Sequence, residues 1–150
     1  MSRYDVMLKR GEYSLLYKEL NGDDMPYNLE NICKPFKKIN ASGIYYFMIY
    51  SLSRRETVDR YITICEVLEY LDQFVDDNYS LMRWYISKGI DSVSDPLKLK
   101  KWIIETYYSS LCGPYEENEL IIFAKDILNS EPQHKESLVL INKSEWRNNK

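Results

Sequence analysis

The residue types that most often carry out acid–base and nucleophilic chemistry are sparse in this sequence. Its one histidine, His134, lies in the polar stretch SEPQHKES, where we expect a solvated loop residue. A general base needs a partner that orients it, and the chain contains neither a G-x-S-x-G nor an S-x-x-K motif. The sequence therefore predicts no catalytic residue and a protein that is not an enzyme.

The three cysteines are Cys33, Cys65 and Cys112, which are far apart and form no CxxC pair. An odd number of separated cysteines is a poor disulfide framework, so a reducing, intracellular setting is the simpler interpretation. Cys65 falls on the apolar face of a predicted helix, which is typical of an inert core thiol.

Carboxylates and glycines give no clear metal or phosphate site. Glu66 and Glu69 form an E-x-x-E pair, but a di-iron bundle requires Glu-x-x-His from two helices, and the chain has one histidine. We therefore interpret the pair as part of a solvated acidic face. The five glycines are isolated, whereas a phosphate-binding loop needs several together before a helix. The sequence thus predicts no metal and no cofactor.

Two groups of lysines stand beside aromatic residues, a combination that can clamp a nucleic-acid backbone and stack bases. They are Lys98, Lys100 and Lys101 before Trp102, and Lys34, Lys37 and Lys38 around Phe36. However, the formal net charge is −3 and the pI about 5.3, which argues against binding by bulk charge. Trp102 also fits an ordinary core stripe. A nucleic-acid-associated helical module is therefore the second hypothesis.

Arginine, tryptophan and tyrosine dominate the hot spots of protein interfaces, and the three occur together in the helix predicted over 79–88, as Arg83, Trp84 and Tyr85. They are the candidate protein-binding residues. The alternative is that Trp84 packs inward between Leu81 and Ile86.

Helical signals dominate the elements that must position these residues. Apolar residues at spacings of three and four predict an amphipathic helix over 57–75, which Ser53 and Glu56 would introduce as a capping box. Asp77 or Asn78 would cap the helix over 79–88 and Gly89 would end it, while Asp95-Pro96 would begin the next. We predict an all-α single-domain bundle of five to seven short helices.

Some elements stay ambiguous. Asn21-Gly22 ends a helical pattern but is also a strong hairpin signal, so a small β-hairpin near residues 13–28 is an alternative. The apolar stretch 43–52 suits a buried helix or a strand, and 136–142 suits a short helix or an edge strand. At ten residues, 43–52 is too short to span a bilayer, which needs about 20. We expect it to be buried in the core; the alternative is that some of its tyrosines lie at the wall of a groove.

Length and composition complete the prediction. A chain of 150 residues favours one globular domain over 1–150 with a frayed tail at 143–150, and the first residues have no apolar signal region. Two alanines against 14 tyrosines suggest the codon bias of an AT-rich genome, as in viruses and phages. We therefore expect a soluble, cytoplasmic, non-enzymatic regulatory protein, such as a viral or phage accessory factor that binds a host protein. No membrane is expected; a second copy of the chain is a further candidate partner, and a nuclear location stays open.

Overall fold

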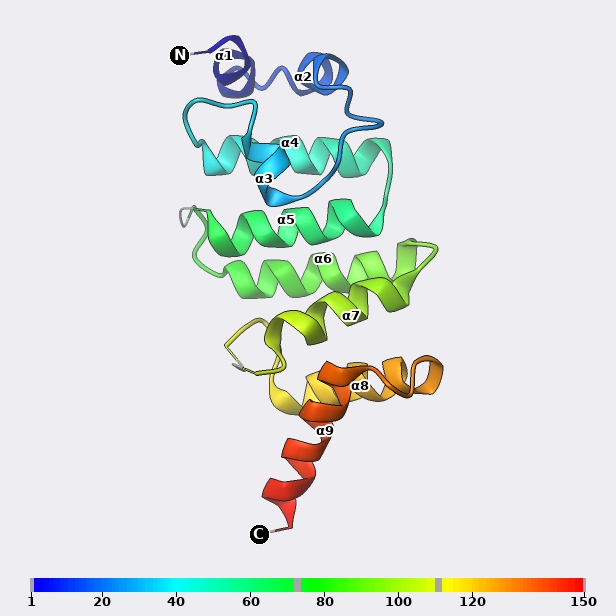
Figure 1. Ribbon diagram of the computed structural model, residues 1–150. Coiled ribbons are helices and arrows are strands. Elements are labelled where there is room, and N and C mark those ends of the chain that lie inside the picture. The colour runs from blue at the N-terminus through cyan, green and yellow to red at the C-terminus, as the bar shows by residue number, and fades with distance from the viewer. Residues whose placement is uncertain (1, 72–73, 110–111, 150) are drawn as a thin grey trace. The chain divides into compact units, whose positions relative to one another are not determined.

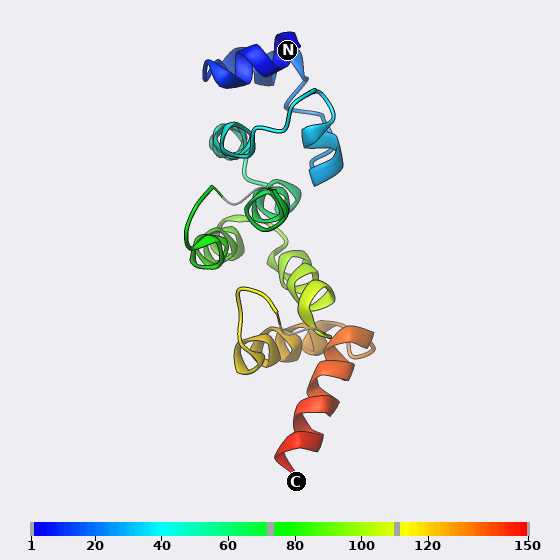
Figure 2. The same ribbon diagram turned by 90° about the vertical axis from the view of Figure 1, so that its left-hand side faces the viewer.

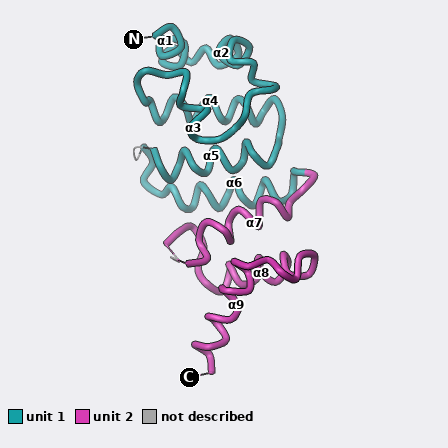
Figure 3. Tube along the Cα trace, viewed as in Figure 1, with its two compact units in different colours: residues 1–93 teal, residues 94–150 magenta. Residues whose placement is uncertain are grey.

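The computed structural model describes residues 2–71, 74–109 and 112–149, and these residues form nine helices and no strand. The chain divides into two compact units, residues 1–93 and 94–150, which are described separately (Figures 1 and 3). The all-α prediction is confirmed. The expected five to seven helices were too few, because the first 40 residues alone contribute three short helices. None of the helices described is long and apolar enough to cross a membrane.

Unit 1 begins with α1 (Arg3–Lys9), α2 (Tyr13–Glu19) and α3 (Leu29–Cys33). A capping box between Ser2 and Asp5 starts α1. The Asp5 carboxylate also accepts hydrogen bonds from the backbone N–H groups of Lys37 and Lys38, at 3.1 and 3.3 Å. Asp5 therefore joins α1 to a loop more than 30 residues further along the chain.

The hairpin predicted near 13–28 is wrong, and the Asn21-Gly22 pair explains why. Asn21 has φ 55°, and its N–H donates to the Lys18 carbonyl while the Gly22 N–H donates to the Tyr17 carbonyl at 2.7 Å. These two bonds make a Schellman motif that ends α2. A left-handed Asn before Gly suits both a hairpin turn and a helix end, and here it serves the helix.

Three longer helices complete unit 1: α4 (Ala41–Arg54), α5 (Val58–Tyr70) and α6 (Asn78–Ser92). They run side by side, with α5 packed against both α4 and α6 (Figures 1 and 2). The apolar stretch 43–52 is thus helical. Its buried face packs against α5, which also packs against α6. The fully buried residues of these three helices include Ile44, Phe47, Met48, Tyr61, Ile64, Cys65, Met82 and Ile86.

Two predicted helix boundaries in unit 1 need correction. Thr57, not Ser53, caps α5, because the Thr57 hydroxyl accepts from the Arg60 N–H and Ser53 lies inside α4. Gly89 does not end α6, which continues to Ser92. A glycine inside a helix costs about 1 kcal/mol relative to alanine, an amount that packing of the buried Gly89 turn can offset. Of the two predicted caps, Asp77 is the one that begins α6, and Asn78 is the first residue of the helix.

Unit 2 consists of α7 (Pro96–Tyr107), α8 (Glu117–Ser130) and α9 (Lys135–Asn148), each packed against the other two. Asp95 and Pro96 begin α7 as predicted. The ambiguous segment 136–142 is helical, and α9 includes most of the tail from 143 onward. The buried apolar residues of the three helices include Leu99, Ile103, Ile104, Leu120, Ala124, Ile127 and Leu140.

Candidate protein-binding groove

A groove in unit 1 lies between the C-terminal half of α4 and α6. It has a volume of about 400 Å³. Aliphatic, aromatic and a few charged side chains line it: Ile49, Leu52, Ser53, Glu56, Trp84, Tyr85, Lys88 and Ser92. Two of the three predicted protein-binding residues, Trp84 and Tyr85, are among them.

A pair of tyrosines joins the two helices beneath this groove. The hydroxyls of Tyr45 on α4 and Tyr85 on α6 are 2.8 Å apart, and their rings pack edge to face at 6.1 Å. Both side chains are buried. Burial, together with the hydrogen bond it shares with Tyr45, raises the pKa of Tyr85 above its usual value. Tyr85 therefore stays neutral, and its hydrogen bond with Tyr45 fixes the spacing of α4 and α6.

Trp84 is the exposed aromatic residue of this groove, with 54% of its surface accessible. The structure does not place it inward between Leu81 and Ile86, because Tyr85 takes the inward position of this turn. The Trp84 ring nevertheless has fixed neighbours. It packs edge to face on Tyr85 at 4.9 Å, and the Lys88 ammonium lies 5.2 Å from its ring centre. An exposed tryptophan held in place by its own protein is typical of an interface anchor.

Two charged residues line the groove: Glu56, which follows the end of α4, and Lys88 on α6. The Glu56 carboxylate accepts a hydrogen bond from the Tyr61 hydroxyl. On the other side, Lys88 contacts the Trp84 ring, and no carboxylate in the described part of the chain lies within ion-pair distance of its ammonium. Lys88 can therefore offer its charge to a bound acidic group.

Arg83, the third predicted residue, is exposed on the same helix but does not line the groove. The structure thus separates the predicted trio: Tyr85 forms the floor, Trp84 the wall, and Arg83 stands on the surface beside them. Whether they bind a protein stays a prediction.

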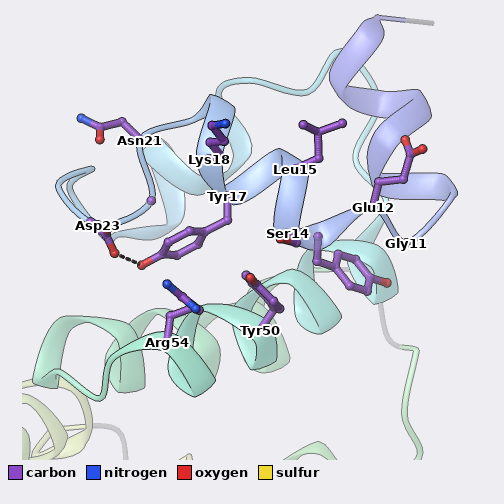
Figure 4. A pocket seen from close by; sticks show the side chains of 12 residues that line it. Gly11, Glu12, Ser14, Leu15, Tyr17, Lys18, Asn21, Asp23, Tyr50 and Arg54 are labelled. Carbon is purple, nitrogen blue, oxygen red and sulfur yellow. Dashed lines mark hydrogen bonds between the residues drawn. The ribbon is translucent and has the colours of Figure 1, made fainter.

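A second, larger hollow of unit 1 lies between α2, the turn after it and α4, with a volume of about 740 Å³ (Figure 4). The Tyr17 hydroxyl donates to Asp23 across it at 2.8 Å, and Tyr50 packs edge to face on the Tyr17 ring at 5.6 Å. Burial raises the pKa of Tyr17. The charged residues that line this hollow are two acids and two bases, Glu12, Asp23, Lys18 and Arg54. The groove also carries one acid and one base, so charge does not separate the two cavities. The hollow is the weaker candidate because none of its tyrosines is exposed, whereas Trp84 is.

Arg60 is a buried charge that supports this part of the fold. Its guanidinium donates to the carbonyl oxygens of Ser51 at 2.6 Å and Gly22 at 3.0 Å, and it lies 4.5 Å from the centre of the Tyr27 ring. Only 1% of Arg60 is exposed. Because backbone carbonyls and an aromatic face satisfy it, Arg60 has a structural role: it ties the end of α2 to α4 and α5.

The six lysines of the nucleic-acid hypothesis fall into two units, three in each. Lys100 pairs with Asp126 at 3.0 Å and Lys101 with Glu131 at 3.0 Å, while Lys98 lies in the first turn of α7. Lys34, Lys37 and Lys38 are exposed around the buried Phe36. Trp102 is half-buried and packs edge to face on Tyr107 at 6.3 Å. Ion pairing weakens the field that two of these lysines would offer a phosphate, and nucleic-acid binding stays a prediction.

Sequence reasoning missed the setting of His134. The expected solvated loop residue instead begins α9, where its Nδ1 accepts from the Ser137 N–H, and its side chain is only 7% exposed. Its Nε2 lies 3.0 Å from the Glu105 carboxylate on α7. Histidine is not among the preferred N-cap residues, and the contact with Glu105, 29 positions away, leaves no local signal in the sequence.

Comparison with protein-family models, with curated proteins and with solved structures finds no match to this chain.

Proposed function

We propose that this chain is a non-enzymatic protein-binding module whose groove between α4 and α6 holds a segment of another protein. The observation that carries the proposal is Trp84, which is more than half exposed although Tyr85 and Lys88 fix its ring. Since this aromatic side chain is ordered before binding, little conformational entropy is lost when a partner covers it.

The lining defines the partner chemistry. Ile49, Leu52 and Trp84 provide an apolar surface for an aliphatic or aromatic anchor, and Lys88 provides a cation beside it. The complementary segment carries an apolar residue next to an acidic one. The composition suggestive of an AT-rich genome supports a viral or phage source, for which a regulatory contact with a host protein is the simplest version of this function.

Selection from a displayed peptide library tests the partner chemistry directly. Peptides selected on the wild-type chain are expected to share an apolar residue beside Asp or Glu. The Trp84→Ala variant should bind them about thirtyfold more weakly, the loss typical of an interface anchor. Trp146→Ala is the matched control, because Trp146 is a similarly exposed tryptophan on α9 of unit 2.

Reversing the charge at Lys88 adds a second readout. A library panned on Lys88→Glu should lose the acidic consensus and gain basic residues. Peptides that bind the Trp84→Ala and Trp146→Ala variants equally well would place the binding site elsewhere and overturn the proposal. A failure to select any peptide on the wild-type chain would count against it as well.

A further inference from the structure

The helices of unit 2 bring together three side chains that sequence reasoning did not combine. Glu105 lies near the end of α7, His134 precedes α9, and Glu136 lies in the first turn of α9. Each offers one metal-ligating atom, and all three atoms lie within 4.8 Å of one another. We infer that Glu105, His134 and Glu136 form a three-ligand site for a divalent transition metal, with Zn²⁺ as the ion that the donor set suits best.

The distances between the ligand atoms support a tetrahedral ion. Zn²⁺ binds nitrogen and oxygen at about 2.0–2.2 Å, which places neighbouring ligands of a tetrahedron roughly 3.3–3.6 Å apart. The Nε2 atom of His134 is 3.0 Å from Glu105 Oε1 and 3.6 Å from Glu136 Oε2. Two edges of the tetrahedron are thus nearly in place. The third edge, between the two carboxylates, is no longer than 4.8 Å, so the flexible glutamates would close by at most about 1.5 Å to complete the site.

Imidazole with two carboxylates is a suitable ligand set for zinc. The two carboxylates also offset the positive end of α9, which by itself would repel a cation. The Glu105 side chain is 48% exposed, so the fourth position faces solvent and can hold a water molecule. The site therefore has the open coordination position that structural four-ligand zinc sites lack.

The other ring nitrogen of His134 has the partner that a metal-bound histidine needs. Nδ1 is 2.8 Å from the hydroxyl of Ser137, a fully buried residue. In the metal-free chain Nδ1 accepts from the Ser137 backbone N–H, so the ring proton is on Nε2 and points to Glu105. On metal binding this proton moves to Nδ1 and is donated to the Ser137 hydroxyl, which leaves Nε2 free for the ion. The hydrogen bond that breaks is the long one from the Ser137 backbone N–H, at 3.3 Å.

Lys101 is an opposing charge: Glu131 first, and Glu105 as well, raise the pKa of its ammonium, so this cation interacts with the Glu105 carboxylate. It pairs with Glu131, so its charge is partly neutralised before a metal enters. We expect Lys101→Met to tighten the site and leave its stoichiometry unchanged.

The experiment uses the full chain stripped of metal with a chelator and titrated with Zn²⁺. Because His134 is the only histidine, its imidazole proton resonances report on this site alone. The expected result is one Zn²⁺ per chain, with those resonances shifting in step with binding measured by calorimetry. Glu105→Gln and Glu136→Gln should each weaken binding at least tenfold. Glu145→Gln, an exposed position on the same helix, is the charge-matched control and should bind normally.

A variant that removes the His134 cap could unfold α9, so the test of the Nε2 ligand uses His134→Asn. Asn is a favoured N-cap residue, so this variant preserves the helix and removes the Nε2 ligand. It should retain the wild-type circular dichroism spectrum and lose Zn²⁺ binding. Histidine resonances that stay fixed during zinc titration, or equal binding by Glu105→Gln and Glu145→Gln, would overturn the inference. Neither result bears on the groove, which belongs to unit 1.

Discussion

The hydroxyl pair of Tyr45 and Tyr85 offers a quantitative test of how the groove between α4 and α6 is held. Each hydroxyl has the other as its partner, at 2.8 Å and away from solvent. Tyr85→Phe removes one partner and leaves the Tyr45 hydroxyl buried without it; Tyr45→Phe does the reverse. The double variant removes both hydroxyls and leaves neither unsatisfied.

The magnitudes follow from this symmetry. A buried polar group that loses its partner costs about 1–3 kcal/mol, whereas replacing both partners by apolar groups of the same shape is nearly neutral. Each single variant should therefore lower the free energy of unfolding by about 1–3 kcal/mol. The double variant should lower it by no more than one single variant does, which gives a coupling energy of at least about 1–3 kcal/mol.

Urea unfolding followed by far-UV circular dichroism measures these differences, provided that the slope with urea is the same in all variants. Tyr46→Phe is the control, because Tyr46 is the neighbouring tyrosine on α4 and is 53% exposed. It should change the free energy of unfolding by less than about 0.5 kcal/mol. Additive losses in the double variant would show that the two hydroxyls do not interact and would refute the reasoning.

Three further predictions concern the rest of the structure. Hydrogen bonds, first that of the Ser2 hydroxyl, lower the pKa of Asp5 below 3.8. Its contribution to the free energy of unfolding is therefore present above pH 3.8 and disappears as pH falls through the lowered pKa. In Asp5→Asn, the free energy of unfolding measured with urea should decrease less in acid than in the wild-type chain. At neutral pH iodoacetamide should label the exposed Cys112 first and Cys65 only on unfolding, because burial shields the Cys65 thiol and raises its pKa. Mass spectrometry measures the labelling, and a label on Cys65 in the native chain would contradict this prediction. Gly22→Ala should lower the free energy of unfolding by roughly 1–3 kcal/mol, since the new Cβ would lie 2.3 Å from the Tyr17 ring. An unchanged urea midpoint would instead show that the ring moves aside freely.

Signals that act within a few residues could be predicted from the sequence. The caps at Asp77 and Asp95 depend on a side chain and an N–H group three positions away, and both were predicted. The apolar spacing of α5 likewise requires only the helix itself. Asn21-Gly22 was ambiguous because the same backbone conformation serves a hairpin and a helix end, and the choice depends on what packs around it.

The candidate sites could be predicted only in part. Residue types picked out Trp84 and Tyr85, but not which of them faces inward, since adjacent positions on a helix differ by about 100° and both suit a core edge. Arg60 and His134 were missed for another reason. Their partners lie 38 and 29 positions away in the chain, at the Gly22 carbonyl and Glu105. Contacts between residues so far apart in the chain depend on how the helices pack against one another, which local sequence patterns do not encode.

The two attachments of the N-terminal helices differ in what can release them. Asp5 ties α1 to the loop at Lys37 through a carboxylate, and this tie ends when the carboxylate takes up a proton. Arg60 holds the end of α2 through the Gly22 carbonyl, a group that does not titrate in acid. Acid below pH 3.8, strong enough to protonate the Asp5 carboxylate, should therefore loosen the contact between α1 and this loop while the end of α2 stays attached. Amide hydrogen exchange would then become faster at Lys37 before it does at Gly22, which would indicate local opening and not global unfolding of the chain.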